Sequence, residues 1–190
     1  MPKDSGGLIK GMFFDLDGTL CDTDEANFLA YKRAFKDEGF NFSKQEFNSV
    51  NGQRADKFIP IVVPGISNQQ VLAIRKRKAK YYPEYMSITK PNNQLIAFLN
   101  LIRTSHTTVL LTTAKRINAE HVIRQSQLTG CFDLMIFGDE VENPKPNPEV
   151  YLTALKKTGL KPAEVIAFED SSSGINAAVS AGLKVIKVEL

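Results

Sequence analysis

Hydrophobic and polar positions follow two different periods along the chain. A continuous apolar run from Leu8 to Phe14 predicts a buried strand. From Thr23 onwards, apolar residues recur at helical spacing as far as Tyr82. After Pro91, short β-branched runs alternate with segments of helical period. They predict strands over 107–111, 134–137, 165–168 and 185–188, and helices over 92–103, 115–127, 148–158 and 174–181.

Strands that alternate with helices imply crossover connections and a parallel sheet. We therefore predict an α/β fold whose core is a Rossmann-like, doubly wound parallel sheet in a three-layer α/β/α arrangement. The helical stretch that separates the first strand from the others predicts a small all-helical cap, inserted after that strand. The expected boundaries are residues 1–21 and 90–190 for the core domain and 22–89 for the cap.

Composition limits the classes of partner. The net charge of +3 is too small to indicate a nucleic-acid-binding protein. The densest basic run, residues 75–80, is read as a solvated helix face, with a patch for an anionic substrate as the alternative. Two cysteines make no disulfide framework, and no apolar run has the length of a signal peptide or membrane span. We expect a cytoplasmic protein with neither nucleic acid nor membrane as partner.

Polar side chains stand where the predicted strands end. The carboxyl ends of parallel strands share one edge of the sheet, which is where such folds place their active groups. Four carboxylates together would repel one another unless a cation lies among them, and oxygen ligands without histidine suit a hard ion such as Mg²⁺. A lysine and a hydroxyl beside that ion suit a phosphoryl group. The residues in question are Asp15, Asp17, Thr112, Lys145, Glu169 and Asp170.

Each of these residues also has a simpler interpretation. The first two aspartates could cap a turn, and Thr112 could be the N-cap of the next helix. Lys145 could be a surface lysine of a loop, although Pro144 and Pro146 restrict it. The acidic pair after the strand 165–168 could cap the helix that follows.

The segments FDLDGTL, Thr112, Lys145 and FEDSSSG occur in the order of the four motifs of the haloacid dehalogenase superfamily. The chain resembles these Mg²⁺-dependent phosphohydrolases along essentially its whole length. The resemblance implies that Asp15 is the nucleophile and that Asp17 is the general acid/base, whose backbone carbonyl also contacts the metal. It further implies that Thr112 holds a phosphoryl oxygen, that Lys145 neutralises nucleophile and phosphate, and that Glu169 and Asp170 anchor Mg²⁺.

The position of the insert resembles the subgroup that contains phosphoglycolate phosphatase and β-phosphoglucomutase. That resemblance adds substrate contacts, namely Gly18, Asn27, Arg54, Thr113 and Lys115. Arg54 could instead be an exposed residue at a helix start. Asn27 stands where the mutase pattern has a histidine, which favours the phosphatase.

The expected function is therefore hydrolysis of a small phosphorylated metabolite through an aspartyl phosphate, by a monomer or weak homodimer. The alternative is a sugar phosphate mutase. A binding module without catalysis is a third interpretation, against which the intact acidic residues and Lys145 argue.

Overall fold

The structure is a computed structural model that describes residues 9–50 and 52–190. Leu8, at the start of the first predicted strand, lies outside the described residues. The chain divides into two compact units. One consists of the described residues up to Asp22 together with Lys90–Leu190, and the other is Thr23–Thr89.

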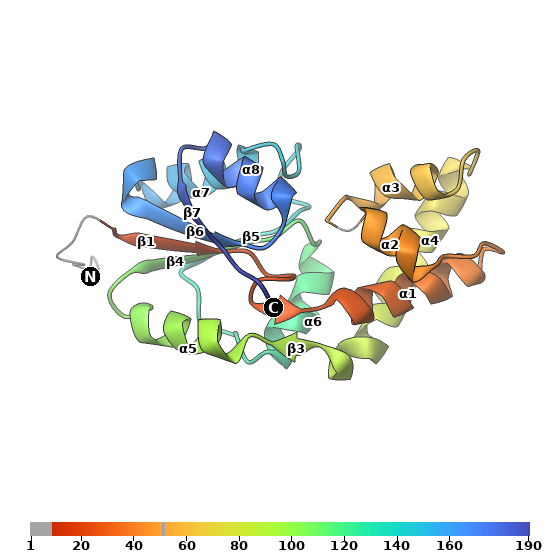
Figure 1. The fold of residues 1–190 in the computed structure, drawn as a ribbon, viewed down its shortest axis with the longest axis horizontal. Helices are drawn as coiled ribbons and strands as arrows, with labels where there is room; N and C mark the ends of the chain where they lie inside the picture. The colour runs from red at the N-terminus through yellow and green to blue at the C-terminus, as the bar shows by residue number, and fades with distance from the viewer. Residues whose placement is uncertain (1–8, 51) are drawn as a thin grey trace. The chain divides into compact units, whose positions relative to one another are not determined.

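Within the described residues, the first unit is built on a five-stranded sheet in the order β5-β4-β1-β6-β7 (Figure 1). Every neighbouring pair of strands is parallel. The chain starts in the centre, moves outward through β4 and β5, and then adds β6 and β7 on the other side, which confirms the doubly wound α/β prediction. The strands are β1 Gly11–Phe14, β4 Thr107–Leu111, β5 Leu134–Ile136, β6 Val165–Glu169 and β7 Lys184–Lys187.

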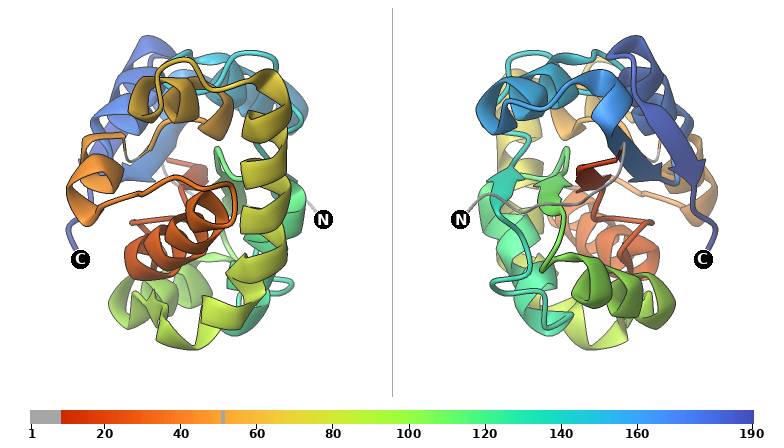
Figure 2. Two further views of the ribbon diagram at one scale, coloured as in Figure 1. Left: turned by 90° about the vertical axis from the view of Figure 1, so that its right-hand side faces the viewer. Right: turned by 90° about the vertical axis from the view of Figure 1, so that its left-hand side faces the viewer.

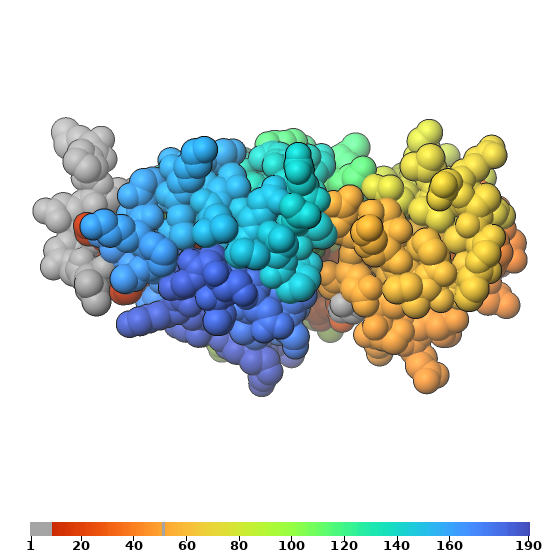
Figure 3. Space-filling view, turned by 90° about the horizontal axis from the view of Figure 1, so that it is seen from above, coloured from red at the N-terminus to blue at the C-terminus, as the bar shows by residue number. Residues whose placement is uncertain are grey.

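Helices cover both faces of this sheet (Figure 2). Helices α7 (Glu149–Thr158) and α8 (Ser172–Ser180) lie on one face, where the space-filling view shows them with the loop before α7 (Figure 3). Helices α5 (Asn93–Ile102) and α6 (Arg116–Gln125) lie on the other face.

The central strand is apolar throughout because it is buried on both faces. Phe13 belongs to the core under α7 and α8. Phe14 points to the opposite face and stacks on Phe168, with the ring centres 4.7 Å apart. Phe168 in turn meets Phe98 of α5. Two-sided burial therefore explains why the strand reads as one continuous apolar run.

A short antiparallel pair completes the first unit. Strands β2 (Cys21–Asp22) and β3 (Lys90–Pro91) pair Cys21 with Pro91 and Asp22 with Lys90. The first unit leaves off at Asp22 and resumes at Lys90, and this pairing brings those two ends of it together.

Regular structure in the second unit is entirely helical over residues 23–50 and 52–89. Ser67 begins α4 with a capping box, in which its hydroxyl accepts from the Gln70 N–H. An aromatic cluster fills the interior, with Phe28, Tyr31, Phe35, Phe42, Phe47 and Phe58 in ring contact. The elements are α1 Asp24–Lys36, α2 Lys44–Val50, α3 Ala55–Val62, α4 Asn68–Tyr81 and the 3₁₀ helix η1 Tyr82–Ile88.

The basic run on α4 is not a uniform solvated face. Lys78 is only 5% exposed, and its ammonium lies 3.5 Å from the centre of the Tyr82 ring. Arg77 is exposed and donates to Glu38 at 2.8 Å. The run is therefore divided between the interior and the surface of this unit. Among the residues described, no helix combines the length and apolarity needed to cross a membrane.

Candidate active site at the carboxyl edge of the sheet

A tight turn follows β1 and carries the first two aspartates. The Asp15 N–H still pairs with Phe168 O at 3.0 Å, so this residue prolongs the strand. The chain then reverses, with the N–H groups of Leu20 and Cys21 donating to Leu16 O. Gly18 lies in this turn at φ +87°, and a Cβ there would come within 2.2 Å of Asp170 Oδ2. Both the backbone conformation and the close approach therefore require glycine at this position.

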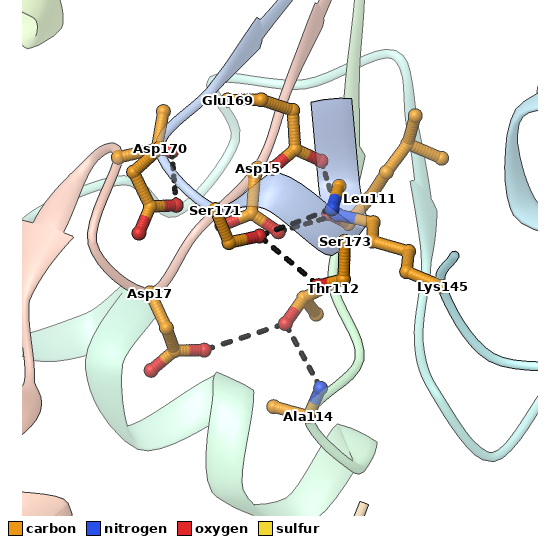
Figure 4. A network of polar contacts seen from close by, with 12 residues as sticks. Asp15, Asp17, Leu111, Thr112, Ala114, Lys145, Glu169, Asp170, Ser171 and Ser173 are labelled. Atoms are coloured by element: carbon orange, nitrogen blue, oxygen red, sulfur yellow. Dashed lines mark hydrogen bonds and ion pairs between the residues drawn. The ribbon is translucent and has the colours of Figure 1, made fainter. Parts of the chain in front are cut away.

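Lys145 is the centre of the polar network (Figure 4). Its ammonium donates to Asp15 Oδ1 at 2.6 Å, to Glu169 Oε1 at 2.5 Å and to Leu111 O at 3.2 Å. An ammonium has three donors, and all three are used. The side chain is 2% exposed, so Lys145 is not a surface lysine of the loop. The network joins β1, the end of β4, β6 and the loop between β5 and α7.

Burial and neighbouring charges act on the ionisation of these groups. Burial raises the pKa of Asp15 well above its ordinary value, and the nearby Glu169 adds to this while Lys145 opposes it. Burial alone would lower the pKa of Lys145, but the charges of Asp15 and Glu169 outweigh it and raise that pKa well above its ordinary value. Burial and Glu169 also raise the pKa of Asp170. The acidic groups therefore repel one another, and Lys145 compensates only part of this charge.

Glu169 ends β6 and is fully buried. Its Oε1 accepts from the Tyr151 hydroxyl as well as from Lys145. Its Oε2 has no hydrogen-bond partner among the described residues, and a Cβ at Gly174 would come within 1.9 Å of it. Sequence reasoning did not find Tyr151, because no local pattern links a helix residue to a carboxylate 18 positions away.

Three of the predicted metal-site residues offer oxygens that lie within 4.8 Å of one another, namely Asp15, Glu169 and Asp170. Asp170 Oδ1 also accepts from the Thr19 hydroxyl at 3.1 Å, a partner that the sequence reasoning missed. A cluster of carboxylate oxygens without nitrogen or sulfur donors fits a hard divalent cation such as Mg²⁺. The side chain of Asp17 is outside this group, so its predicted metal contact through the backbone carbonyl stays a prediction.

Asp17 and Thr112 form a second contact in the site (Figure 4). The Thr112 hydroxyl donates to Asp17 Oδ2 at 3.3 Å and accepts from the Ala114 N–H at 3.0 Å. The N-cap of α6 is Lys115 rather than Thr112, so the simple capping interpretation of Thr112 is wrong. Asp15 thus faces the buried Lys145, while Asp17 faces the hydroxyl that follows β4.

The other predicted substrate contacts of the first unit lie after β4. Thr113 is half-buried, and its carbonyl is the atom that a Cβ at Gly138 would meet at 2.0 Å. Lys115 is exposed at the start of α6. The roles of Thr113 and Lys115 stay predictions.

The capping interpretation of Glu169 and Asp170 is wrong. They do not cap α8, because Ser171 does so by accepting from the Gly174 N–H at 3.1 Å.

Two predicted substrate contacts belong to the second unit and have partners there. Arg54 precedes α3 and donates to Asp56 through Nε at 3.0 Å and Nη2 at 3.4 Å. Although burial raises the pKa of Asp56, the Arg54 guanidinium outweighs it and lowers that pKa. Asn27 donates to the Thr23 hydroxyl at 3.0 Å. Both residues are thus held within their own unit, and their contact with a substrate stays a prediction.

Comparison with known proteins gives a consistent result. Residues 12–188 match the haloacid dehalogenase-like hydrolase family. The chain is 30% identical over 181 residues to the phosphorylated carbohydrates phosphatase of Thermotoga maritima, covering 93% of this chain and 83% of the relative. It is 26% identical over 189 residues to the β-phosphoglucomutase of Bacillus subtilis, covering 95% and 83%. The crystal structure of CbbY from Rhodobacter sphaeroides in complex with phosphate shares the fold, with a TM-score of 0.86 and 23% identity over 96% of this chain and 87% of the other. The chain therefore belongs to the haloacid dehalogenase-like hydrolase family.

Proposed function

We propose that this protein is a phosphatase that hydrolyses the phosphomonoester of a small phosphorylated metabolite through an aspartyl phosphate. The observation that carries the proposal is the pairing of Asp15 with the buried Lys145 beside two further carboxylates. The Lys145 ammonium favours the ionised form of Asp15 against the effect of burial and holds its oxygen in place, as a nucleophile requires. The relative from Thermotoga maritima is named for phosphorylated carbohydrates, so a sugar phosphate is the first substrate to test.

The reaction divides into two displacements at phosphorus. A carboxylate oxygen of Asp15 forms a bond to phosphorus while the ester P–O bond breaks, and Asp17 gives its proton to the leaving oxygen. Asp17 then takes a proton from water, whose oxygen attacks phosphorus and releases inorganic phosphate and free Asp15.

The remaining groups of the site support these steps. Lys145 neutralises charge on Asp15 and on the phosphoryl oxygens. The Thr112 hydroxyl, which donates to Asp17 in this structure, donates to a phosphoryl oxygen when the substrate binds. Asp15 and Asp170, with Glu169 beside them, would hold Mg²⁺, which supplies positive charge to the transferring phosphoryl group.

The test is hydrolysis of p-nitrophenyl phosphate and of a panel of phosphorylated sugars, with MgCl₂ and with EDTA. We expect Mg²⁺-dependent release of phosphate that is lost in Asp15→Asn. Glu164→Gln is the matched control, because it neutralises a carboxylate that pairs with Lys10 just before β6, at the opposite end of that strand from Glu169. Turnover that survives in Asp15→Asn would exclude Asp15 as the nucleophile.

A sugar phosphate mutase is the second candidate. The Bacillus subtilis relative favours it, as do Arg54 and Lys115 at positions that resemble substrate contacts of that subgroup. Asn27 disfavours it, because the mutase pattern has a histidine there. Conversion of β-glucose 1-phosphate to the 6-phosphate without net phosphate release would establish the mutase.

A further inference from the structure

Both carboxylate oxygens of Glu169 have close neighbours in the structure. Its Oε1 is shared between the Lys145 ammonium and the Tyr151 hydroxyl. Its Oε2 faces Gly174, where even a methyl group would collide with it. The carboxylate is fully buried, so the loss of a hydrogen-bond partner is costly. Its orientation depends on the two donors at Oε1.

Tyr151 is placed to control this carboxylate. Its ring is fully buried in the core under α7 and α8, so packing fixes where the hydroxyl lies. The Lys145 ammonium lies 5.5 Å from the centre of the same ring, so one side chain contacts both members of the ion pair. The ring accounts for the packing, whereas the hydroxyl serves only the polar network.

We propose that Tyr151 is a positioning residue that acts through Glu169 to keep the Lys145 ammonium shared with Asp15. This rests on the proposed phosphatase function, in which Asp15 is the nucleophile. It adds to that function a group outside the four sequence motifs.

The distances carry the inference. Lys145 Nζ lies 2.5 Å from Glu169 Oε1 and 2.6 Å from Asp15 Oδ1, so two carboxylates compete almost equally for one ammonium. The Tyr151 hydroxyl occupies part of the acceptor capacity of Oε1 and weakens its attraction for Lys145. Without that hydroxyl, Glu169 keeps one donor at Oε1 and draws the ammonium towards itself. Asp15 and the phosphoryl group would then lose compensating charge.

The test begins with Tyr151→Phe, which removes the hydroxyl and leaves the ring in the core. The matched control is Thr108→Val, near the amino-terminal end of β4, whereas the Lys145 network meets β4 at its carboxyl end, at Leu111. Thr108 is also buried in the first unit, and its hydroxyl donates to Cys131 O and to the carboxylate of Asp133. Both variants lose a buried hydroxyl and some stability, but only the first touches the Lys145 network.

We expect Tyr151→Phe to lower kcat by about tenfold, since hydrogen bonds to charged groups are strong and only part of the loss reaches the transition state. Thr108→Val should keep its kcat. In the Glu169→Gln background, where a neutral side chain no longer competes strongly for the ammonium, Tyr151→Phe should change kcat less than about twofold. An equal loss in both backgrounds would overturn the proposal.

A second measurement does not depend on any enzymatic activity. The Lys145 ammonium is buried and fully hydrogen-bonded, so its proton–nitrogen correlation is observable by NMR and is assigned by its disappearance in Lys145→Arg. Tyr151→Phe should shift this signal and Thr108→Val should not. An unshifted signal refutes the positioning role even in an active enzyme. A shifted signal in a protein that hydrolyses no phosphate would instead refute the proposed function.

Discussion

Asp170→Asn should stabilise the protein in the absence of metal and destabilise it, relative to wild type, in its presence. Asp170 is near two other acidic groups, Asp15 and Glu169, with oxygens within 4.8 Å. Lys145 offsets part of their charge. Asparagine keeps the oxygen that accepts from Thr19 and removes only the charge.

The magnitude follows from the charges. Two unit charges 4 Å apart interact by about 4 kcal/mol at an effective dielectric constant of about 20. Of the two neighbouring carboxylates, one is compensated by Lys145, and the partly exposed Asp170 is further screened by water. We therefore expect a gain of about 1–2 kcal/mol without metal. For a chain of this size this raises Tm by roughly 2–8 °C.

The gain depends on pH in a defined direction. The pKa of Asp170 is raised in the folded state, by burial and then by Glu169. Above the folded pKa both states are ionised, and the folded state carries the full cost. As pH falls through the folded pKa, the folded protein takes up the proton first and the cost is relieved. The advantage of Asp170→Asn should be largest above the folded pKa and vanish towards the ordinary aspartate pKa of about 4.

The assay is thermal unfolding followed by far-ultraviolet circular dichroism, because the chain has no tryptophan. Wild type should gain about 2.7 kcal/mol at a Mg²⁺ concentration of about 100 Kd, and the variant, which lacks one ligand, should gain less. The order of the two Tm values should therefore reverse between EDTA and MgCl₂. Asp22→Asn is the control, since it removes an exposed ion pair with Lys90 that contributes little.

Two results would refute this reasoning. A lower Tm for Asp170→Asn in EDTA would mean that the carboxylate is stabilising and that the repulsion is compensated by other groups. An equal rise of Tm with Mg²⁺ in both proteins would mean that Asp170 does not hold the metal.

Three further predictions concern single side chains. Gly174→Ala should lower the free energy of unfolding by about 1–3 kcal/mol and reduce kcat, because its Cβ would lie 1.9 Å from Glu169 Oε2; an unchanged Tm would contradict the tight packing. Ser67→Ala should cost about 1 kcal/mol in thermal unfolding because α4 loses its capping box, with kcat unchanged; a variant as stable as wild type argues against the cap. Asp17→Asn should still bind Mg²⁺ and phosphate in calorimetry, with kcat lower by about 10²–10⁴-fold; near-normal kcat would exclude Asp17 as the acid.

Several site contacts depend on residues far apart in the chain, and no local pattern reveals them. Thr19 and Asp170 are 151 positions apart, and Tyr151 and Glu169 are 18 apart. The glycine that faces Glu169 Oε2 reads in sequence only as part of a helix start. Lys78 is buried, although its charged neighbours Lys76, Arg77 and Lys80 are exposed. Such partners are set by how helices and turns pack, which residue spacing does not encode.

The sequence by itself determined the order along the chain of the five parallel strands and the helices between them, the doubly wound fold and the family, but not the short strands β2 and β3. Periodicity reports which face of each element is buried, and a parallel sheet brings all its strand ends to one edge. It also placed Asp15, Lys145 and Glu169 at that edge, where the structure joins them. Only the tertiary structure decided which carboxylate shares the ammonium, which hydroxyl holds Glu169 and where glycine is obligatory. These outcomes depend on how side chains from separate elements pack against one another, which local residue spacing does not encode.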